Sequence, residues 1–153
     1  SGPAVEHPLL ARLGPEPFDA AFDADYVFRA TRSRSAAIKL ALMDNTLVTG
    51  VGNIYANEAL FRAGIRPTTP AHRVSRPRLA RLVGEVRAVL TEAIAKGGST
   101  LRDYVDASGE PGYFQLDYFV YGREGEPCRA RGTAIRHRRL GARASFYCPR
   151  CQR

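Results

Sequence analysis

The sequence lacks a long apolar run, and its first residues do not have the pattern expected of a secretory leader. Its 153 residues contain no stretch of about 18 consecutive apolar residues, so a transmembrane helix is excluded. The first ten residues, SGPAVEHPLL, have neither the basic n-region nor the apolar h-region of a signal peptide. Hydrophobic residues make up 44% of the chain, which is ordinary for a globular protein and can support a core. The length fits one domain or two small ones.

Cysteine is scarce and confined to one end of the chain. Cys128, Cys148 and Cys151 all lie within the last 26 residues, so they do not form a disulfide framework. Their Cys-x-x-Cys pair favours a metal ion or reduced thiols in a cytosolic protein. With a cysteine at position 131, the spacing would be the C-x2-C-x16-C-x2-C of a four-cysteine zinc site. Arg131 stands there instead, and its cationic side chain is a poor metal ligand.

Two alternatives follow for this cysteine-bearing tail. Either zinc persists on three thiolates with a non-protein fourth ligand, or the tail contains no metal. We favour the metal-free form, because a structural zinc site depends on closed four-coordination for most of its folding free energy. His137, the only histidine of the tail, is far in sequence from both ends of the cysteine pattern. In the metal-free form, apolar residues must hold the tail together: Ile135, Leu140, Phe146 and Tyr147.

Charge of one sign is concentrated in the same tail. Residues 1–121 carry 14 Lys and Arg against 13 Asp and Glu, a net charge of +1. Residues 122–153 carry nine Arg, no Lys and two Glu, a net charge of +7. Arginine forks suit phosphate groups, so a polyanion is the expected partner. A solvated basic tail is the alternative, although the mixture of apolar residues and cysteines in ASFYCPRC is unusual for a disordered segment.

The apolar pattern predicts a helical body with a small β segment after it. We expect an extended lead-in over residues 1–17, a helical domain over 18–117 and a hairpin over 118–153. Apolar residues spaced three and four apart over the stretch from Pro77 to Gly97-Gly98 predict the longest helix. A further short helix is expected in TLRDYVDA. The expected helix caps and stops are Asp23, Ser35, Asn53, Gly64 and Ser75.

The stretch GVGNIYANE is the most informative part of the body. Gly50 and Gly52 allow tight turns, and Asn53 is placed to cap a helix that begins at Ile54. A glycine-flanked helix start presents free N–H groups and a positive dipole end, which suit a phosphate, although most such caps are only caps. Lys39 lies among apolar residues, where an ordinary snorkelling lysine is the default interpretation.

Several segments together resemble one family. IKLALMDNTLVTGVGNIYANEALFRAGIRP resembles the helix–two-turns–helix element of the formamidopyrimidine-DNA glycosylase (Fpg/Nei) family. LGPEPF, GGSTLRDY, GEPGYF, VYGREGEPC and FYCPRCQR follow in the order of that family. The resemblance covers residues 7–153. It implies a mainly α fold, in which a helix–two-turns–helix DNA-binding domain precedes a zinc-finger β-hairpin whose family cofactor is Zn²⁺.

The resemblance also implies roles for single residues. Lys39 and Asn53, with Gly52 at the helix start, would grip phosphates around a damaged nucleotide. Arg143 corresponds to the finger arginine, which contacts the lesion phosphate and acts catalytically in the late elimination step. Tyr121 corresponds to a phosphate-contacting tyrosine, with a packed core position as the alternative. Arg34 is near a usually basic position, which aligns with Ser35. A loop closing over the extruded base is implied for Ser108, Gly109, Glu110, Pro111, Gly112, Tyr113 and Phe114.

These implications lead to an expected function. We expect the DNA-binding half of a base-excision-repair glycosylase and AP lyase that removes oxidised purines such as formamidopyrimidines and 8-oxoguanine. The family's nucleophile is an N-terminal proline followed by a glutamate, and Pro3 does not match that pattern. This chain alone is therefore expected to bind duplex DNA with oxidised bases or abasic sites without excising them. A monomer in the bacterial cytoplasm, at the nucleoid and away from membranes, is expected. The alternatives are a non-catalytic nucleic-acid-binding module and a zinc-ribbon interaction domain.

Overall fold

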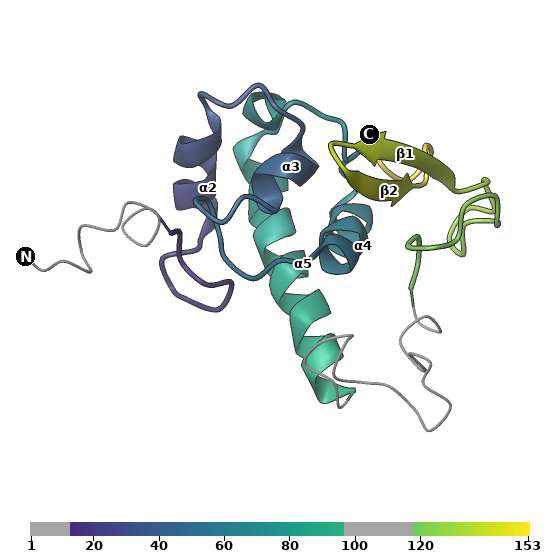
Figure 1. The fold of residues 1–153 in the computed structure, drawn as a ribbon, viewed down its shortest axis with the longest axis horizontal. Coiled ribbons are helices and arrows are strands. Elements are labelled where there is room, and N and C mark those ends of the chain that lie inside the picture. Colours follow the sequence, from purple (N-terminus) through teal and green to yellow (C-terminus); the bar gives the residue numbers. More distant parts are fainter. Residues whose placement is uncertain (1–12, 97–117) are drawn as a thin grey trace, which may run out of the picture.

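The computed structural model describes residues 13–96 and 118–153 (Figure 1). Within these ranges the chain is mainly α-helical and ends in a two-stranded antiparallel hairpin, as expected from the sequence. Pro3, the segment TLRDYVDA and the loop from Ser108 to Phe114 lie outside the described residues. Among the described helices, none has the length and hydropathy that crossing a bilayer requires. The elements are α2 (Ala24–Thr31), α3 (Ile38–Leu42), α4 (Asn53–Ala63), the 3-10 helix η2 (Ala71–Arg73), α5 (Arg76–Ala95), β1 (Arg136–Leu140) and β2 (Arg143–Tyr147).

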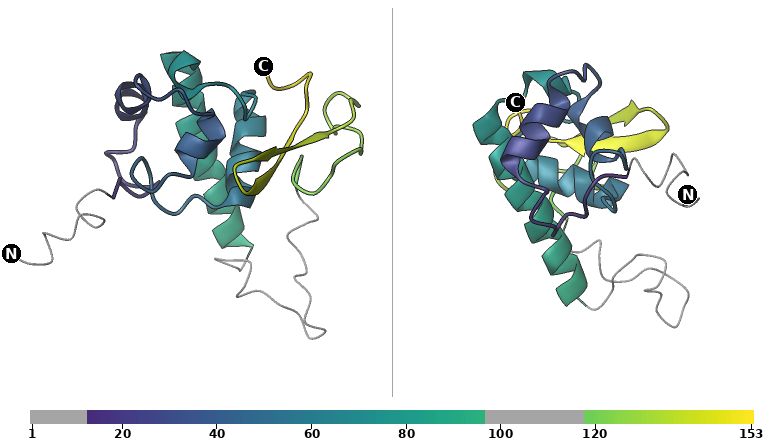
Figure 2. Two further views of the ribbon diagram at one scale, coloured as in Figure 1. Left: turned by 45° about the horizontal axis from the view of Figure 1, so that its top comes forward. Right: turned by 90° about the vertical axis from the view of Figure 1, so that its left-hand side faces the viewer.

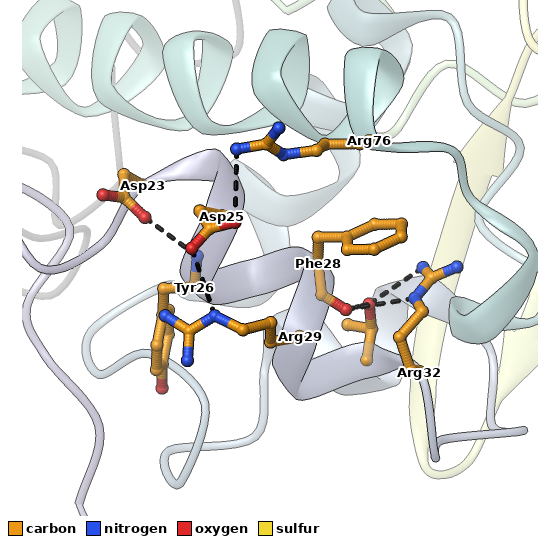
Figure 3. Close-up of polar contacts among 8 residues, drawn as sticks. Asp23, Asp25, Tyr26, Phe28, Arg29, Arg32 and Arg76 are labelled. Carbon is orange, nitrogen blue, oxygen red and sulfur yellow. Dashed lines mark hydrogen bonds and ion pairs between the residues drawn. The ribbon is translucent and has the colours of Figure 1, made fainter.

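Three of the expected helix boundaries are confirmed. The Asp23 carboxylate caps α2 by accepting the N–H of Tyr26 at 2.8 Å (Figure 3). Gly64 ends α4 in the left-handed region, with φ of 73°. Ser75 occupies the N-cap position of α5, with Pro77 in the first turn, but its side chain makes no capping hydrogen bond. Local sequence signals therefore predict the start of α2, the end of α4 and the start of α5.

Two expected caps are wrong, and tertiary contacts explain both. Ser35 does not start α3, because the helix begins only at Ile38, whose N–H donates to the Thr69 carbonyl at 2.7 Å. Asn53 does not cap α4. It is the first residue of the helix, Gly52 holds the N-cap position, and the Asn53 amide bonds to the hairpin instead. Contacts from distant segments thus take the place of side-chain caps at both helix starts.

The main core lies where α5 packs against α2 and α4. Figures 1 and 2 show α5 running the length of the body, with α2 and the hairpin on opposite sides of α3 and α4. Apolar positions of α5 at helical spacing face this core, as the sequence pattern predicts, whereas Ile94 near its end is 59% exposed. The largest fully buried apolar side chains of this core are Phe22, Ile38, Leu42, Leu47, Leu60, Ile65, Leu79 and Leu82.

Arginines fasten α2 to the start of α5 (Figure 3). Arg76 of α5 pairs with Asp25 at 3.2 Å, and Asp25 also pairs with Arg29 one turn further along α2 at 3.1 Å. Arg32 donates to the carbonyls of Phe28, His72 and Val74 at 2.7–3.0 Å. Arg32 thereby satisfies backbone acceptors at the end of one helix and around the 3-10 turn before the next.

The hairpin carries a small core of its own. β1 and β2 pair in register from Arg136 opposite Tyr147 to Leu140 opposite Arg143. Gly141, with φ of 62°, forms the two-residue turn between them with the next residue. Of the four expected core residues, Ile135, Phe146 and Tyr147 are buried, whereas Leu140 is only half-buried. The Arg66 guanidinium lies over the Tyr147 ring, 5.3 Å from its centroid. The cluster itself contains Val120, Cys128, Ile135, Phe146 and Cys148.

Candidate nucleic-acid interface

One backbone carbonyl collects polar side chains from three segments. The carbonyl oxygen of Ala144, in β2, accepts hydrogen bonds from Lys39 Nζ at 3.2 Å, Asn53 Nδ2 at 3.1 Å and Asn57 Nδ2 at 3.4 Å. The sequence singled out Lys39 and Asn53, and the structure brings them together. Asn57 was missed, although its position one helical turn after Asn53 could have indicated a shared polar face. We call these four residues the Ala144 junction.

Lys39 is fully buried at this junction, so the interpretation as a snorkelling lysine is wrong. Burial lowers the pKa of its ammonium to about 8, and the positive charge of Arg143 contributes to the same shift. Its hydrogen-bond partner is a neutral carbonyl, so the ammonium charge is not compensated by that bond. Arg143 itself is exposed at the start of β2, beside Ala144. The junction therefore concentrates positive charge.

The start of α4 adds to this positive charge. Gly50 has φ of 82°. Gly52, at the N-cap position, has an extended backbone and no side chain that could cap the helix. Because the side chain of Asn53 bonds to the hairpin, the N–H groups of the first helical turn remain without a side-chain acceptor. The N-terminal end of the helix dipole, one ammonium and one guanidinium thus lie close together, an arrangement that favours an anion.

The other two expected phosphate contacts have different surroundings. Arg34 forms an ion pair with Asp44 at 2.9 Å and also donates to Thr46. The N–H of Thr46 and the Arg34 guanidinium, acting against partial burial, hold the pKa of Asp44 below its ordinary value. Tyr121 is half-buried, and its ring packs edge-on against Phe146 with centroids 5.1 Å apart. Arg34 anchors a loop and Tyr121 packs in the hairpin core, while their phosphate contacts stay predictions.

Glu58 is a positioning residue that the sequence reasoning missed. Its buried carboxylate accepts the backbone N–H groups of Phe119, Val120 and Tyr121 at 2.7–2.9 Å. Burial raises the pKa of Glu58 above its ordinary value, and the three N–H donors act in the opposite direction. An acid within the apolar run of a helix was the available signal. Glu58 fixes the segment that enters the hairpin against α4.

The other end of the hairpin is also fastened to the helical body. Gln152 is fully buried; its Oε1 accepts the N–H of Cys148 at 2.8 Å, and its Nε2 donates to the Ile65 carbonyl at 2.9 Å. Asn57 Oδ1 accepts the N–H of Phe146 at 2.7 Å. Arg66 donates to the Pro149 carbonyl at 2.8 Å. The hairpin and the helices therefore share buried hydrogen bonds, which fix the position of the strand that carries Arg143.

The three cysteines meet as expected. Cys128 Sγ and Cys151 Sγ are 3.7 Å apart, and all three sulfur atoms lie within 4.8 Å of one another. The N–H of Ala130 points to Cys128 Sγ, and that of Cys151 to Cys148 Sγ, each at 3.4 Å. Burial and the neighbouring thiols raise the pKa of Cys151 to about 12. Burial also acts to raise the pKa of Cys128, but N–H donors including that of Arg131 bring it below its ordinary value. The cluster can hold a metal ion.

The residues present do not complete a closed structural zinc site. Such a site is almost always four-coordinate, and the described residues around this cluster supply three thiols and no fourth histidine, cysteine or carboxylate. Arg131, three residues after Cys128, is exposed and offers none of these ligand atoms. His137 lies in β1, its ring against Phe146 and its Nδ1 3.8 Å from a Glu124 carboxylate oxygen. The donor set therefore leaves one coordination position without a protein ligand.

A helical body, a cationic junction at a helix start and a cysteine-bearing basic hairpin place the chain in a class of helix-rich proteins with a surface suited to anions. Residues 13–105 match the formamidopyrimidine-DNA glycosylase H2TH domain, which is more than half of the chain. The chain therefore belongs to the formamidopyrimidine-DNA glycosylase family.

Relatives and solved structures agree with this placement. The chain is 62% identical over 149 residues to the formamidopyrimidine-DNA glycosylase of Ralstonia pickettii, covering 97% of this chain and 51% of the relative. It is 59% identical to that of Burkholderia thailandensis, covering 100% of this chain and 55% of the relative. The crystal structure of MutM (Fpg) from Thermus thermophilus has a TM-score of 0.83 and 46% identity, covering 99% of this chain and 57% of that one. A complex of Lactococcus lactis Fpg with abasic-site DNA has a TM-score of 0.84 and 33% identity, covering 98% and 55%. This chain thus spans about half the length of the curated relatives it matches.

Proposed function

We propose that this chain is the DNA-binding part of a base-excision-repair DNA glycosylase and AP lyase that acts on oxidised purines. The observation that carries the proposal is the Ala144 junction, where a buried lysine, a helix start and an exposed arginine concentrate positive charge. Family membership supports it, as do solved complexes of Lactococcus lactis Fpg with abasic-site and FAPY-dG DNA. Formamidopyrimidines and 8-oxoguanine are the proposed lesions.

In this proposal the junction holds the DNA backbone next to the damaged nucleotide. The free N–H groups at the start of α4 bind one phosphate, and the buried ammonium of Lys39 adds its positive charge to that site. Asn53 fixes the carbonyl next to Arg143. Arg143, at the tip of the hairpin, contacts the phosphate at the lesion and assists the late elimination step. Such enzymes act on a base taken out of the stack. We assign the closing contact with that base to the loop from Ser108 to Phe114.

The role of Arg143 can be tested by DNA titration. For a duplex with a stable abasic-site analogue, affinity should fall with rising salt, by a log–log slope of about 0.9 per neutralised phosphate. Arg143→Ala should weaken binding and reduce that slope by about 1. Arg81→Ala, which removes an exposed arginine of α5, is the matched control for net charge and should leave the slope nearly unchanged. Equal effects of both variants, or binding independent of salt, would contradict the proposal.

Excision is tested separately. We propose that a polypeptide of these 153 residues binds damaged DNA without cleaving it. In such a polypeptide Pro3 is not the terminal residue and is not followed by glutamate, so it does not match the family's nucleophile. Borohydride trapping on oxidised-purine and abasic duplexes should give no covalent adduct. An adduct would show that a nucleophile of this chain was missed.

Two other functions give different titration results. A non-catalytic nucleic-acid-binding module would bind undamaged and abasic duplexes equally well through its arginines. A zinc-ribbon interaction domain would bind neither duplex appreciably. Preference for the abasic duplex, lost in Arg143→Ala, supports the glycosylase role over both.

The incomplete cysteine site leads to a second part of the proposal. We propose that the hairpin is held by its apolar cluster and by hydrogen bonds to α4, not by a closed zinc site. Elemental analysis of protein purified without chelator should give well below one zinc per chain. Arg131→Cys should raise both zinc content and melting temperature. Zinc bound stoichiometrically by the unaltered protein would contradict this part.

A further inference from the structure

We propose that the three-thiol cluster of Cys128, Cys148 and Cys151 is a binding site for a soft metal ion that is satisfied by three thiolates, with monovalent copper as the probe. The observation behind it is the convergence of three sulfur atoms within 4.8 Å where the fourth position of the pattern holds an exposed arginine. Cu(I) is a soft ion that thiolates select, and it does not require a fourth ligand. This inference is independent of the proposed action on DNA.

The sulfur positions match the size of such an ion. An ion about 2.3 Å from each sulfur separates the sulfurs by about 3.8 Å in tetrahedral and about 4.0 Å in trigonal geometry. Cys128 Sγ and Cys151 Sγ are already 3.7 Å apart, and the third sulfur lies within 4.8 Å of both. Binding therefore requires only a small closure of the cluster.

The turns that carry the sulfurs are held in place by the protein itself. The N–H of Cys128 donates to the Thr133 carbonyl at 2.8 Å, and the N–H of Gly132 donates to the Cys128 carbonyl at 2.7 Å. In the second turn, the N–H of Cys148 donates to buried Gln152 at 2.8 Å. Because these bonds do not involve the side chain at position 131, the turn that lacks a fourth cysteine keeps its shape. A preorganised site lowers the ordering cost of binding.

Coordination number and charge both favour Cu(I) over Zn²⁺ here. Zn²⁺ on three protein thiolates needs water or another outside ligand, whereas the Cys148 and Cys128 side chains are buried among apolar residues. Three thiolates keep a net charge of −2 around Cu(I) and −1 around Zn²⁺. Exposed arginines stand in both turns of the cluster, at Arg129, Arg131 and Arg150, and they offset the larger residual negative charge.

The test is an anaerobic titration of the reduced chain with Cu(I) and, separately, with Zn²⁺, each against a competing chelator. We expect one Cu(I) per chain, with three sulfur neighbours by X-ray absorption. Arg131→Cys should strengthen Zn²⁺ binding by a factor of about 100 or more, because it closes the four-thiolate site, and should change Cu(I) binding by about tenfold at most. Arg131→Ser controls for the loss of positive charge without a new ligand and should not reproduce the zinc effect.

Three results would overturn the proposal. The first is Zn²⁺ binding to the unaltered chain as tightly as to Arg131→Cys. The second is a two-sulfur Cu(I) site. The third is unchanged Cu(I) affinity in Cys151→Ser, which removes the only half-buried thiol of the three. If Cys151→Ser does not fold, the sulfur count around Cu(I) in the unaltered chain still decides the matter.

Discussion

At the scale of single residues, polar groups of α4 determine how the hairpin is placed. Asn57 and Glu58 are buried and Asn53 is half-buried. The three lie within six consecutive residues and direct their side chains to backbone groups of the hairpin segment. Buried polar groups are costly unless they are hydrogen-bonded, so each of these side chains specifies one arrangement of its partner. The same residues that dock the hairpin thereby fix the position of the strand that carries Arg143.

Replacement of Glu58 by glutamine tests this docking. The glutamine Nε2 is a donor where the carboxylate oxygen accepted, so at least one N–H among residues 119–121 loses its partner. We expect a loss of about 2 kcal/mol in the free energy of unfolding, measured by chemical denaturation. Glu16→Gln, at an exposed glutamate, is the matched control and should change stability by less than about 0.5 kcal/mol. Equal stability of both variants would show that Glu58 does not dock the hairpin.

Lys39 should make DNA affinity depend on pH. Burial, with the charge of Arg143, lowers its pKa to about 8, and a phosphate favours the protonated form. Affinity for duplex DNA should therefore fall as the pH rises from about 7 to about 9, by about tenfold at most. The free energy of unfolding should instead rise with pH. Because the folded pKa lies below the ordinary 10.5, the protein loses its lysine proton before the unfolded chain does, and stability rises as the pH passes upward through about 8.

The variant Lys39→Met isolates this effect. Any other group that titrates in the same range does so in both proteins. The difference between the two pH profiles therefore belongs to Lys39. Parallel affinity profiles for Lys39→Met and the unaltered chain would contradict the assignment of Lys39 to the phosphate site.

At the scale of elements, two glycines should respond to alanine in opposite directions. Gly141 has φ of 62° in the hairpin turn, a conformation that alanine rarely adopts, although its Cβ would meet only Leu40 at 3.7 Å. Gly84 lies inside α5 with open space around it. Gly141→Ala should lower stability by about 1 kcal/mol, and Gly84→Ala should raise it by about 0.5–1 kcal/mol. Thermal melting of the two variants gives both signs in one experiment, and a loss in both would mean that α5 does not tolerate the methyl group.

At the scale of the whole molecule, the hairpin and the helical body should unfold together. Gln152 joins the second cysteine turn to the backbone after α4 through two buried hydrogen bonds. Gln152→Ala leaves both backbone groups without these partners and should reduce stability by about 2–3 kcal/mol. Near-UV dichroism, to which the tyrosines of both parts contribute, and far-UV dichroism of the helices should still report one transition. Arg150→Ala, at an exposed neighbour, should have little effect, and separate transitions in the unaltered chain would contradict this coupling.

Features that arise from neighbouring residues could be predicted from the amino-acid pattern. The Asp23 cap, the Gly64 stop and the apolar spacing of α5 depend on backbone geometry within one or two turns, so local patterns predicted them. The mainly α fold with a terminal hairpin was likewise predicted, and the Cys-x-x-Cys spacing with the two glycines before α4 indicated where chemistry would occur. The phosphate-binding roles of Lys39 and Asn53 stay predictions.

The partners of the polar side chains of α3 and α4 depend on how distant segments pack together. Lys39 and Asn53 meet the Ala144 carbonyl from 105 and 91 positions away in the chain. Glu58 bonds to N–H groups more than 60 positions away. Local propensity carries no information about such partners. The local pattern therefore predicts a helix cap at Asn53 and a snorkelling side chain at Lys39, and it indicates no partner for Glu58. Their roles depend on the desolvation that occurs when the hairpin packs on α4, which makes each distant hydrogen bond necessary.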